Sequence, residues 1–269
     1  MKKLTIISIV ASVIFSCKNS DKNNTPSDLR TDGQQKTFTP IINYTIEMTF
    51  PHNTKSFTQG LAFYKGELYE GTGEKGESRL LKVDLKTGKT LKAIDLEDKY
   101  FGEGITILND SVFQLTWQEN VVFVYDVKSF KKLKEFRLET EGWGIANDGN
   151  QLIVSDGTST LYFYEPSTFK LKKKLPVKDN GTLAYNLNEL EYIDGYVYAN
   201  QWQLPYILKI NPETGNVEAK INMESVWKRV LAYDPEADVP NGIAYDSSTR
   251  KIYVTGKRWP ELYEIKLSN

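Results

Sequence analysis

Apolar and polar positions alternate along most of the chain, in short segments separated by turn-forming residues. The segments are about five to eight residues long and rich in β-branched and aromatic side chains, which is typical of strands. Turn sequences such as LKTGK (85–89) and NPETG (211–215) separate neighbouring segments. The stretch 223–233 is the one candidate for an amphipathic helix. The pattern therefore predicts an all-β protein.

This arrangement of segments recurs five times. Each repeat opens with a glycine or polar residue followed by an apolar pair, and the openings are FTQGLAF (57–63), FGEGITI (101–107), EGWGIAN (141–147), NLNELEY (186–192) and VPNGIAY (239–245). Two further segments follow in every repeat, and a fourth follows in the first four repeats. Repeats of about 40–50 residues with four strands each are the signature of a β-propeller.

The fifth repeat ends at Asn269 after three segments. The segment 41–50 precedes the first repeat and supplies the missing fourth strand, which closes the ring and leaves no open sheet edge. We therefore predict a single five-bladed β-propeller domain over residues 41–269. A generic antiparallel sandwich would not explain the five-fold register.

Aligning the repeats brings ten positions to one mouth of the central channel. In a propeller the first strand of each blade lines the channel, and antiparallel pairing places its start beside the end of the second strand. The openings contribute Gln59, Glu103, Trp143, Asn188 and Asn241, and the second strands contribute Gly73, Trp117, Gly157, Trp202 and Lys257.

Three tryptophans around one carboxylate are typical of a small-molecule pocket, in which apolar walls surround a few polar groups. Burial among these rings would raise the pKa of Glu103 and suit it to general acid–base catalysis. The competing carboxylates are Glu189, Glu191 and Asp156. A channel plugged by mixed side chains, with no activity, is the alternative on this pattern alone.

Composition excludes several other kinds of protein. The chain has 34 Lys+Arg and 35 Asp+Glu, and this balance argues against a dedicated nucleic-acid binder. A single Cys rules out a disulfide within the chain, and a single His makes a zinc site of the usual His/Cys type untenable. We interpret that histidine, His52, as a loop residue.

The first 17 residues have the pattern of a bacterial lipoprotein signal. Lys2 and Lys3 precede an apolar run that is too short to span a bilayer, and Cys17 follows directly, although Phe15 is bulkier than usual before such a cysteine. An ordinary signal cleaved nearby is the alternative. Residues 18–40 are polar and without periodicity, which predicts a flexible tether. We expect a lipid-anchored protein of the bacterial cell envelope, facing the periplasm or the outside.

Six motifs together resemble the plant and bacterial type of glutaminyl-peptide cyclotransferase: FTQGL (57–61), FGEGI (101–105), LTW (115–117), GWG (142–144), NELE (188–191) and NQW (200–202). The resemblance implies a five-bladed propeller and an acyltransferase that converts N-terminal Gln of peptides or proteins into pyroglutamate and releases ammonia. It also implies acid–base chemistry without catalytic zinc or another required cofactor. Plant members carry a structural calcium ion in the channel, and the sequence leaves open whether this chain binds one.

The resemblance also assigns roles to individual residues. Glu103 matches the catalytic acid, and Gln59 and Asn188 match amides of the pocket. Lys257 matches a basic residue there. The remaining substrate-binding residues are aromatic: Phe57, Phe101, Trp117, Trp143 and Trp202. Gly102 departs from the pattern, because bulkier side chains occur at its position, and we expect a wider pocket there.

Two other functions would use the same mouth of the channel. A membrane-tethered propeller without catalysis would use the same mouth to bind a peptide, a sugar or another small ligand. A calcium-dependent lactonase-type propeller needs several carboxylates at the mouth, whereas the aligned positions hold only Glu103. We expect a monomer whose partners are peptides with N-terminal Gln and, through its anchor, the membrane. The segment 223–239 is either a lid at the mouth or a connection between blades.

Overall fold

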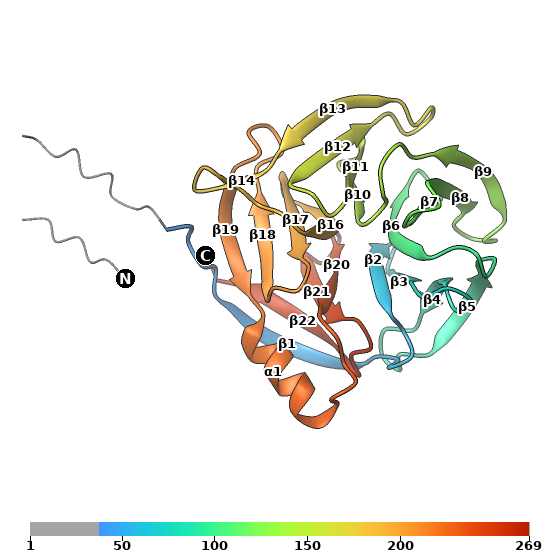
Figure 1. Cartoon of the computed structure of the whole chain (residues 1–269). Coiled ribbons are helices and arrows are strands. Elements are labelled where there is room, and N and C mark those ends of the chain that lie inside the picture. The colour runs from blue at the N-terminus through green and yellow to red at the C-terminus, as the bar shows by residue number, and fades with distance from the viewer. Residues whose placement is uncertain (1–37, 269) are drawn as a thin grey trace, which may run out of the picture. The chain divides into compact units, whose positions relative to one another are not determined.

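The computed structural model describes residues 38–268, and these residues form five four-stranded antiparallel sheets arranged as blades around a central channel (Figure 1). The prediction of an all-β, five-bladed propeller is confirmed. None of the helices in this part of the chain is long and apolar enough to cross a membrane. Cys17 and most of the tether lie outside the described residues.

Each of the first four blades consists of four strands that follow one another in the sequence. Blade 1 contains β2 (Thr58–Tyr64), β3 (Glu67–Thr72), β4 (Arg79–Val83) and β5 (Thr90–Asp95). Blade 2 contains β6 (Gly102–Leu108), β7 (Ser111–Thr116), β8 (Val121–Asp126) and β9 (Lys132–Arg137). Blade 3 contains β10 (Ile145–Asn147), β11 (Leu152–Ser155), β12 (Thr160–Tyr164) and β13 (Leu171–Pro176). Blade 4 contains β16 (Leu187–Ile193), β17 (Tyr196–Gln201), β18 (Tyr206–Ile210) and β19 (Val217–Asn222).

The fifth blade closes the ring with strands from both ends of the domain. Its sheet order is β1-β22-β21-β20, with β20 (Pro240–Asp246) innermost, then β21 (Lys251–Gly256) and β22 (Glu261–Leu267). The outermost strand, β1 (Tyr44–Pro51), pairs antiparallel with β22. This pairing confirms that the segment before the first repeat completes the last blade.

Two connections form regular structure of their own. A short hairpin of β14 (Lys178–Asp179) and β15 (Thr182–Leu183) joins blades 3 and 4 and was not predicted. The helix α1 (Glu224–Tyr233) forms within the predicted stretch and lies at the outer edge of the ring beside β1 (Figure 1). Val226 and Val230 are buried in the apolar cluster between blades 4 and 5, so α1 is part of a blade connection.

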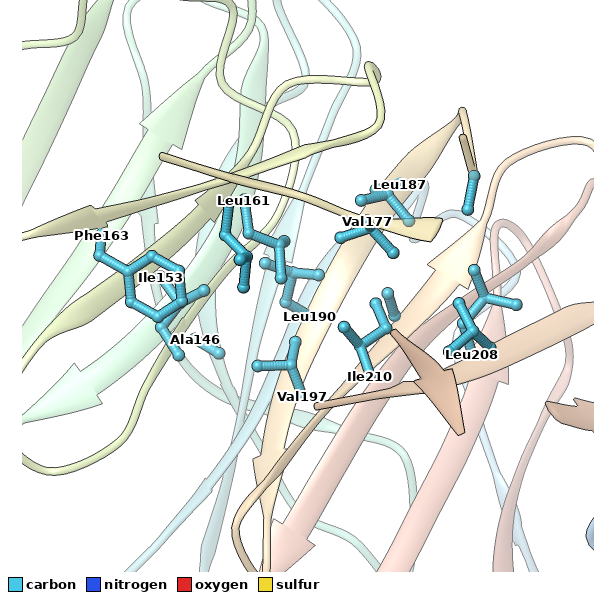
Figure 2. Packing of buried hydrophobic residues seen from close by; sticks show 14 residues of the cluster. Ala146, Ile153, Leu161, Phe163, Val177, Leu187, Leu190, Val197, Leu208 and Ile210 are labelled. Carbon is cyan, nitrogen blue, oxygen red and sulfur yellow. The ribbon is translucent and has the colours of Figure 1, made fainter. Parts of the chain in front are cut away.

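Each pair of neighbouring blades is joined by one cluster of buried apolar side chains. Figure 2 shows the cluster between blades 3 and 4, with Ile153 and Leu161 from blade 3 and Leu190 and Leu208 from blade 4. Equivalent clusters join the other pairs, including blades 5 and 1. Side-chain packing therefore connects every blade to its neighbours all around the ring. The ends of the inner strands surround the two mouths of the channel.

The inner strands of blades 1 to 3 approach their neighbours so closely that the position after Gln59, Glu103 and Trp143 has no room for a side chain. A Cβ atom at Gly60 would lie 2.3 Å from the backbone nitrogen of Ile105, and one at Gly104 would lie 2.8 Å from that of Ile145. Backbone atoms held in a neighbouring blade cannot move aside to relieve such contacts. Close approach of the blades therefore requires glycine at these positions.

Blade 4 carries Glu189 at the equivalent position. Its carboxylate accepts hydrogen bonds from the backbone amides of Leu61 in blade 1 (3.2 Å) and Ile243 in blade 5 (2.9 Å). Burial raises the pKa of Glu189 well above its ordinary value and nearby Glu191 adds to this, while the two amides oppose it. The side chain thus ties the inner strands of three blades together within the channel.

His52 lies in a loop, as predicted, and its side chain is buried between blades 1 and 5. Nδ1 lies 2.6 Å from the carbonyl oxygen of Trp259, and Nε2 lies 3.0 Å from Oε1 of Glu70. Both partners are acceptors, so both ring nitrogens must donate. Burial alone lowers the pKa of His52, but the charge of Glu70 and these hydrogen bonds outweigh it and raise the pKa above the ordinary value.

We expect the charge on His52 to stabilise the junction of blades 1 and 5. Because its pKa is raised on folding, the stabilisation is complete at low pH and is lost as pH rises through the pKa of the folded state. Below about pH 6.5, His52→Gln should lower the free energy of unfolding by about 1.5–3 kcal/mol, the range for hydrogen bonds to charged groups. Urea unfolding of both proteins across pH measures this difference, and a gap that widens toward alkaline pH would contradict it.

Candidate active site

One mouth of the channel opens into a pocket of about 280 Å³. Every pocket residue named from the sequence lines it, and Asp238 is an addition that the sequence analysis did not name. The lining residues are Phe57, Gln59, Phe101, Glu103, Trp117, Trp143, Asn188, Trp202, Asp238 and Lys257. The five-fold register therefore brings together side chains that are up to 200 residues apart in the sequence.

A repeated backbone hydrogen bond places the rim of the pocket. In blade 2 the amide of Trp117, which follows β7, donates to the carbonyl oxygen of Phe101 over 3.0 Å. In blade 5 the amide of Lys257, which follows β21, donates to the carbonyl oxygen of Val239, also over 3.0 Å. Each bond ties the end of a second strand to the start of a first strand, so the side chains that follow the second strands project at the mouth.

Aromatic rings form most of the pocket wall. Phe101 lies edge-to-face between Phe57 and Trp117, with ring centroids 6.2 and 5.7 Å away. Trp143 and Trp202 meet edge-to-face at 5.4 Å. Such pairs are favoured by the charge distribution of the rings, and each restrains its neighbour. The wall therefore consists of two groups of contacting rings rather than separate side chains.

Glu103 is the buried carboxylate of this pocket, with a relative exposure of 5%. Nε2 of Gln59 donates a hydrogen bond to Oε1 of Glu103 over 3.1 Å, and Nδ2 of Asn241 donates to the side-chain oxygen of Gln59 over 3.3 Å. Asn241 thereby orients the amide of Gln59, so that its NH₂ group faces Glu103.

The environment of Glu103 favours its neutral form. Burial raises the pKa of Glu103 well above its ordinary value; Lys257 lowers it, and Glu141 and Glu119 raise it further. A carboxylate with a raised pKa exchanges protons with an amine far more readily than an ordinary glutamate does. Glu103 can therefore accept and donate a proton at a higher pH than an ordinary glutamate does.

Lys257 supplies the positive charge of the pocket. Burial lowers its pKa, and the negative charges of Glu103, Asp238 and Glu74 oppose this shift. Within residues 38–268, no carboxylate lies within ion-pairing distance of Lys257. Its Nζ lies 4.5 Å from the centre of the Phe57 ring, a cation–π contact that holds the side chain at the wall. The ammonium group thus keeps its donors for a ligand.

Asn188 offers an unused acceptor. Its Oδ1 atom is buried and has no hydrogen-bond partner among the described residues. A buried acceptor without a partner is costly. Asn188 also lines the pocket, so its side-chain amide is placed beside a polar group of a bound ligand.

Two functional positions escaped the sequence analysis. Glu141 accepts hydrogen bonds from the indole nitrogens of Trp117 (2.8 Å) and Trp143 (3.0 Å). The aligned repeats could have identified Glu141, because it precedes Trp143 by two residues just as Phe57 precedes Gln59. Asp238 lies on the exposed rim at the end of the blade connection that contains α1, and no repeated pattern marks it.

The expectation that Gly102 widens the pocket is wrong. Gly102 does not line the pocket, and a Cβ atom there would lie 2.7 Å from the backbone oxygen of Thr72 and 3.2 Å from Ser78. A larger residue would therefore press on blade 1. Within the segment 223–239 only Asp238 reaches the pocket, so α1 is not a lid.

The competing carboxylates lie elsewhere. Glu189 is bound within the channel, and Asp156 accepts hydrogen bonds from the backbone and hydroxyl of Thr158 in a turn. Glu191 lines a separate cavity of about 390 Å³, which the far ends of the inner strands surround. Burial raises the pKa of Glu191 to about 8, although the amide of Tyr245 opposes the shift. None of these groups faces the aromatic pocket.

The described side chains do not form a calcium site of their own. Among residues 38–268 there is no group of three or more His, Cys, Asp or Glu side chains close enough to hold a metal ion. Both carboxylate oxygens of Glu189, the acid within the channel, already accept backbone amides. A structural ion in the channel would therefore have to use other donors, such as backbone carbonyls.

Comparisons with known proteins agree on one family. The family model described as glutamine cyclotransferase matches residues 14–267. Over 221 residues the chain is 44% identical to the glutaminyl-peptide cyclotransferase of Arabidopsis thaliana, an alignment that covers 81% of this chain and 69% of the relative. The crystal structure of Myxococcus xanthus glutaminyl cyclase matches with a TM-score of 0.80 and 34% identity, covering 85% of this chain and 98% of that one.

Proposed function

The chain belongs to the glutamine cyclotransferase family, and on that premise we propose that it converts N-terminal Gln of peptides or proteins into pyroglutamate and releases ammonia. One observation carries the proposal beyond family membership. Glu103 is a buried carboxylate with a raised pKa, and it faces an aromatic pocket of about 280 Å³. A pocket that served binding alone would not need a proton-exchanging group at this point, so the family and the site do not favour a non-catalytic propeller.

The reaction closes a five-membered lactam within the substrate. The α-amine attacks the side-chain carbonyl carbon of the same residue, and the amide nitrogen leaves as ammonia. Because both reacting groups belong to one molecule, restraining them in the attacking geometry supplies several kcal/mol of the barrier reduction. The aromatic wall formed by residues such as Phe101, Trp117 and Trp143 provides this restraint.

Glu103 moves the protons. An N-terminal ammonium has a pKa of about 8, and it can attack only as the neutral amine, after losing a proton to water. As this amine attacks, the carboxylate of Glu103 accepts one of its two remaining protons, and Gln59 steadies the carboxylate through the hydrogen bond to Oε1. Glu103 then gives the proton to the departing amide nitrogen. One residue serves both steps because the attacking and leaving nitrogens are bonded to the same carbon.

We assign Lys257 and Asn188 to the binding of polar groups of the substrate. The Lys257 ammonium is free of carboxylate partners in the described part of the chain and can stabilise the oxyanion of the tetrahedral intermediate. The side-chain amide of Asn188, which lines the pocket, contacts a polar group of the substrate. The indole N–H groups of Trp117 and Trp143 are already bound to Glu141 and do not serve as oxyanion donors. These side chains supply proton transfer and charge stabilisation, so we assign no step to a cofactor.

We also propose that the enzyme is a monomer anchored to the bacterial envelope through a lipid on Cys17. The signal-like pattern of residues 1–17 and the polar stretch 18–40 support this part of the proposal. From Pro40 onward the chain joins the propeller, because the carbonyl oxygen of Pro40 accepts the amide of Lys220 in β19 over 2.9 Å. A lipid anchor would therefore be joined to the rim of blade 4.

Cys17→Ala tests the anchor. If Cys17 carries the lipid, the wild-type chain collects in the membrane fraction of a bacterial host and the variant does not. Turnover per molecule should be unchanged, because the proposed mechanism uses only residues of the propeller. Equal membrane association of both proteins would show that the cysteine is not the attachment point.

Glu103→Gln tests the catalytic assignment. Glutamine keeps the size of the side chain but cannot exchange protons, so kcat should fall by about 10²-fold or more. Ammonia release from a short Gln-initiated peptide measures kcat, and thermal unfolding checks the fold. Glu191→Gln is a matched control, because it alters another buried glutamate with a raised pKa, at the far cavity. Near-normal turnover in Glu103→Gln, or an equal loss in the control, would reject the assignment.

The pH dependence of kcat follows from the two shifted groups. We expect kcat to rise with pH as Glu103 ionises, with an apparent pKa above the ordinary range for glutamate. We expect it to fall again as Lys257 loses its proton, at a pH below the ordinary range for lysine. Lys257→Arg should remove the alkaline decline, since arginine stays charged. A decline that is identical in Lys257→Arg would exclude Lys257 as its source.

A further inference from the structure

We propose that Glu141 is a positioning residue that holds Trp117 and Trp143 in the arrangement that receives the substrate. This inference rests on the proposed cyclisation of N-terminal Gln, because it concerns how that substrate is restrained. Glu141 does not line the pocket itself. It acts through the two indoles that do.

A single carboxylate oxygen of Glu141 accepts hydrogen bonds from the indoles of both tryptophans. Oε2 of Glu141 accepts the indole N–H of Trp117 over 2.8 Å and that of Trp143 over 3.0 Å. The other oxygen, Oε1, accepts the side-chain amide of Gln118 over 3.0 Å. An indole has only one donor, so each of these two rings has committed its N–H to Glu141. The two tryptophans come from different blades, and the shared oxygen sets the position of one ring relative to the other.

This bond completes the aromatic wall. Ring contacts run from Phe57 through Phe101 to Trp117, and a separate contact joins Trp143 to Trp202. Glu141 connects these two groups through the indole nitrogens. The wall therefore extends around the pocket as one linked set, with a carboxylate at the junction between its halves.

Glutamate suits this junction better than an aromatic residue would. Phe57 and Phe101 occupy the corresponding register positions in blades 1 and 2, each two residues before a mouth residue. A phenyl ring at position 141 would offer no acceptor to the two indoles. Burial alone raises the pKa of Glu141, but the hydrogen bonds from Trp143, Gln118 and Trp117 outweigh it and hold the pKa below the ordinary value. The side chain thus stays ionised, and hydrogen bonds to an ionised acceptor are the stronger kind.

Three variants separate positioning from charge. Glu141→Leu removes both acceptors and leaves two indole donors without partners. Glu141→Gln keeps one oxygen that can accept both indoles, while its NH₂ group faces Gln118, whose amide can turn to accept it. Glu139→Gln is the matched control, because Glu139 is an exposed acid of the same loop with no hydrogen bond to the pocket. Thermal unfolding of each variant shows whether the fold is kept.

Two readouts are needed, one of which does not depend on turnover. The first is the nitrogen-15 NMR spectrum of the full chain, in which each of the five tryptophans gives one indole N–H signal. In Glu141→Leu the signals of Trp117 and Trp143 should move and exchange faster with water, while those of Trp227 and Trp259, which do not line the pocket, stay in place. The second is the kinetics of ammonia release from the dipeptide Gln-Ala. There kcat/KM should fall by about 10- to 100-fold, through kcat as well as KM, because the indoles both contact the substrate and restrain it in the attacking geometry.

The combined outcomes decide the matter. Glu141→Gln and Glu139→Gln should keep kcat/KM within about threefold of the wild-type value, a change smaller than the loss of one typical hydrogen bond. Unchanged indole signals in Glu141→Leu would overturn the proposal, and so would altered signals with an unchanged kcat/KM. An equal loss in Glu141→Gln would show that charge, and not positioning, is what the residue contributes. If the wild-type protein releases no ammonia from Gln peptides, the proposed function fails. The indole signals, together with peptide binding to the pocket, still test whether Glu141 positions the two indoles.

Discussion

The close approach of five inner strands around one narrow channel is the constraint on which the rest of this molecule depends. Gly60 and Gly104 permit that approach, because any side chain there would meet the backbone of the next blade. Glu189 occupies the equivalent position in blade 4 and binds amides of blades 1 and 5. The inner strands are therefore packed closely around the channel axis. The residue just before each of these positions lies at the mouth.

The tight channel explains the chemistry of the mouth. Glu103 precedes Gly104, so the contact that packs blade 2 against blade 3 also holds the carboxylate at the buried end of the aromatic pocket. Burial then raises its pKa, Gln59 and Asn241 orient it, and Lys257 balances the cost of its negative charge. The strand geometry and the acid–base character of Glu103 thus have one physical origin.

Much of this follows from the sequence because a propeller repeats its own register. The aligned repeats were enough to predict the blade count, the closing strand and seven of the pocket residues, including Trp202 and Lys257 from the second strands, whereas Phe57 and Phe101 came from the family resemblance. Features that depend on single side-chain contacts were missed. The burial of His52 against Glu70 and the binding of two indoles by Glu141 arise from packing between blades, which no local pattern encodes. Gly102 was misread for the same reason, because its neighbours belong to blade 1.

The central claim is that Glu103 and the aromatic pocket cyclise an N-terminal glutamine within one substrate molecule. The most direct test is to incubate the protein with a Gln-initiated peptide carrying nitrogen-15 in the side-chain amide alone, and to follow both products by mass spectrometry. We predict that all the label leaves as ammonia and that the product is an unlabelled pyroglutamyl peptide. Label retained in the peptide, or no conversion by a folded protein, would contradict the account.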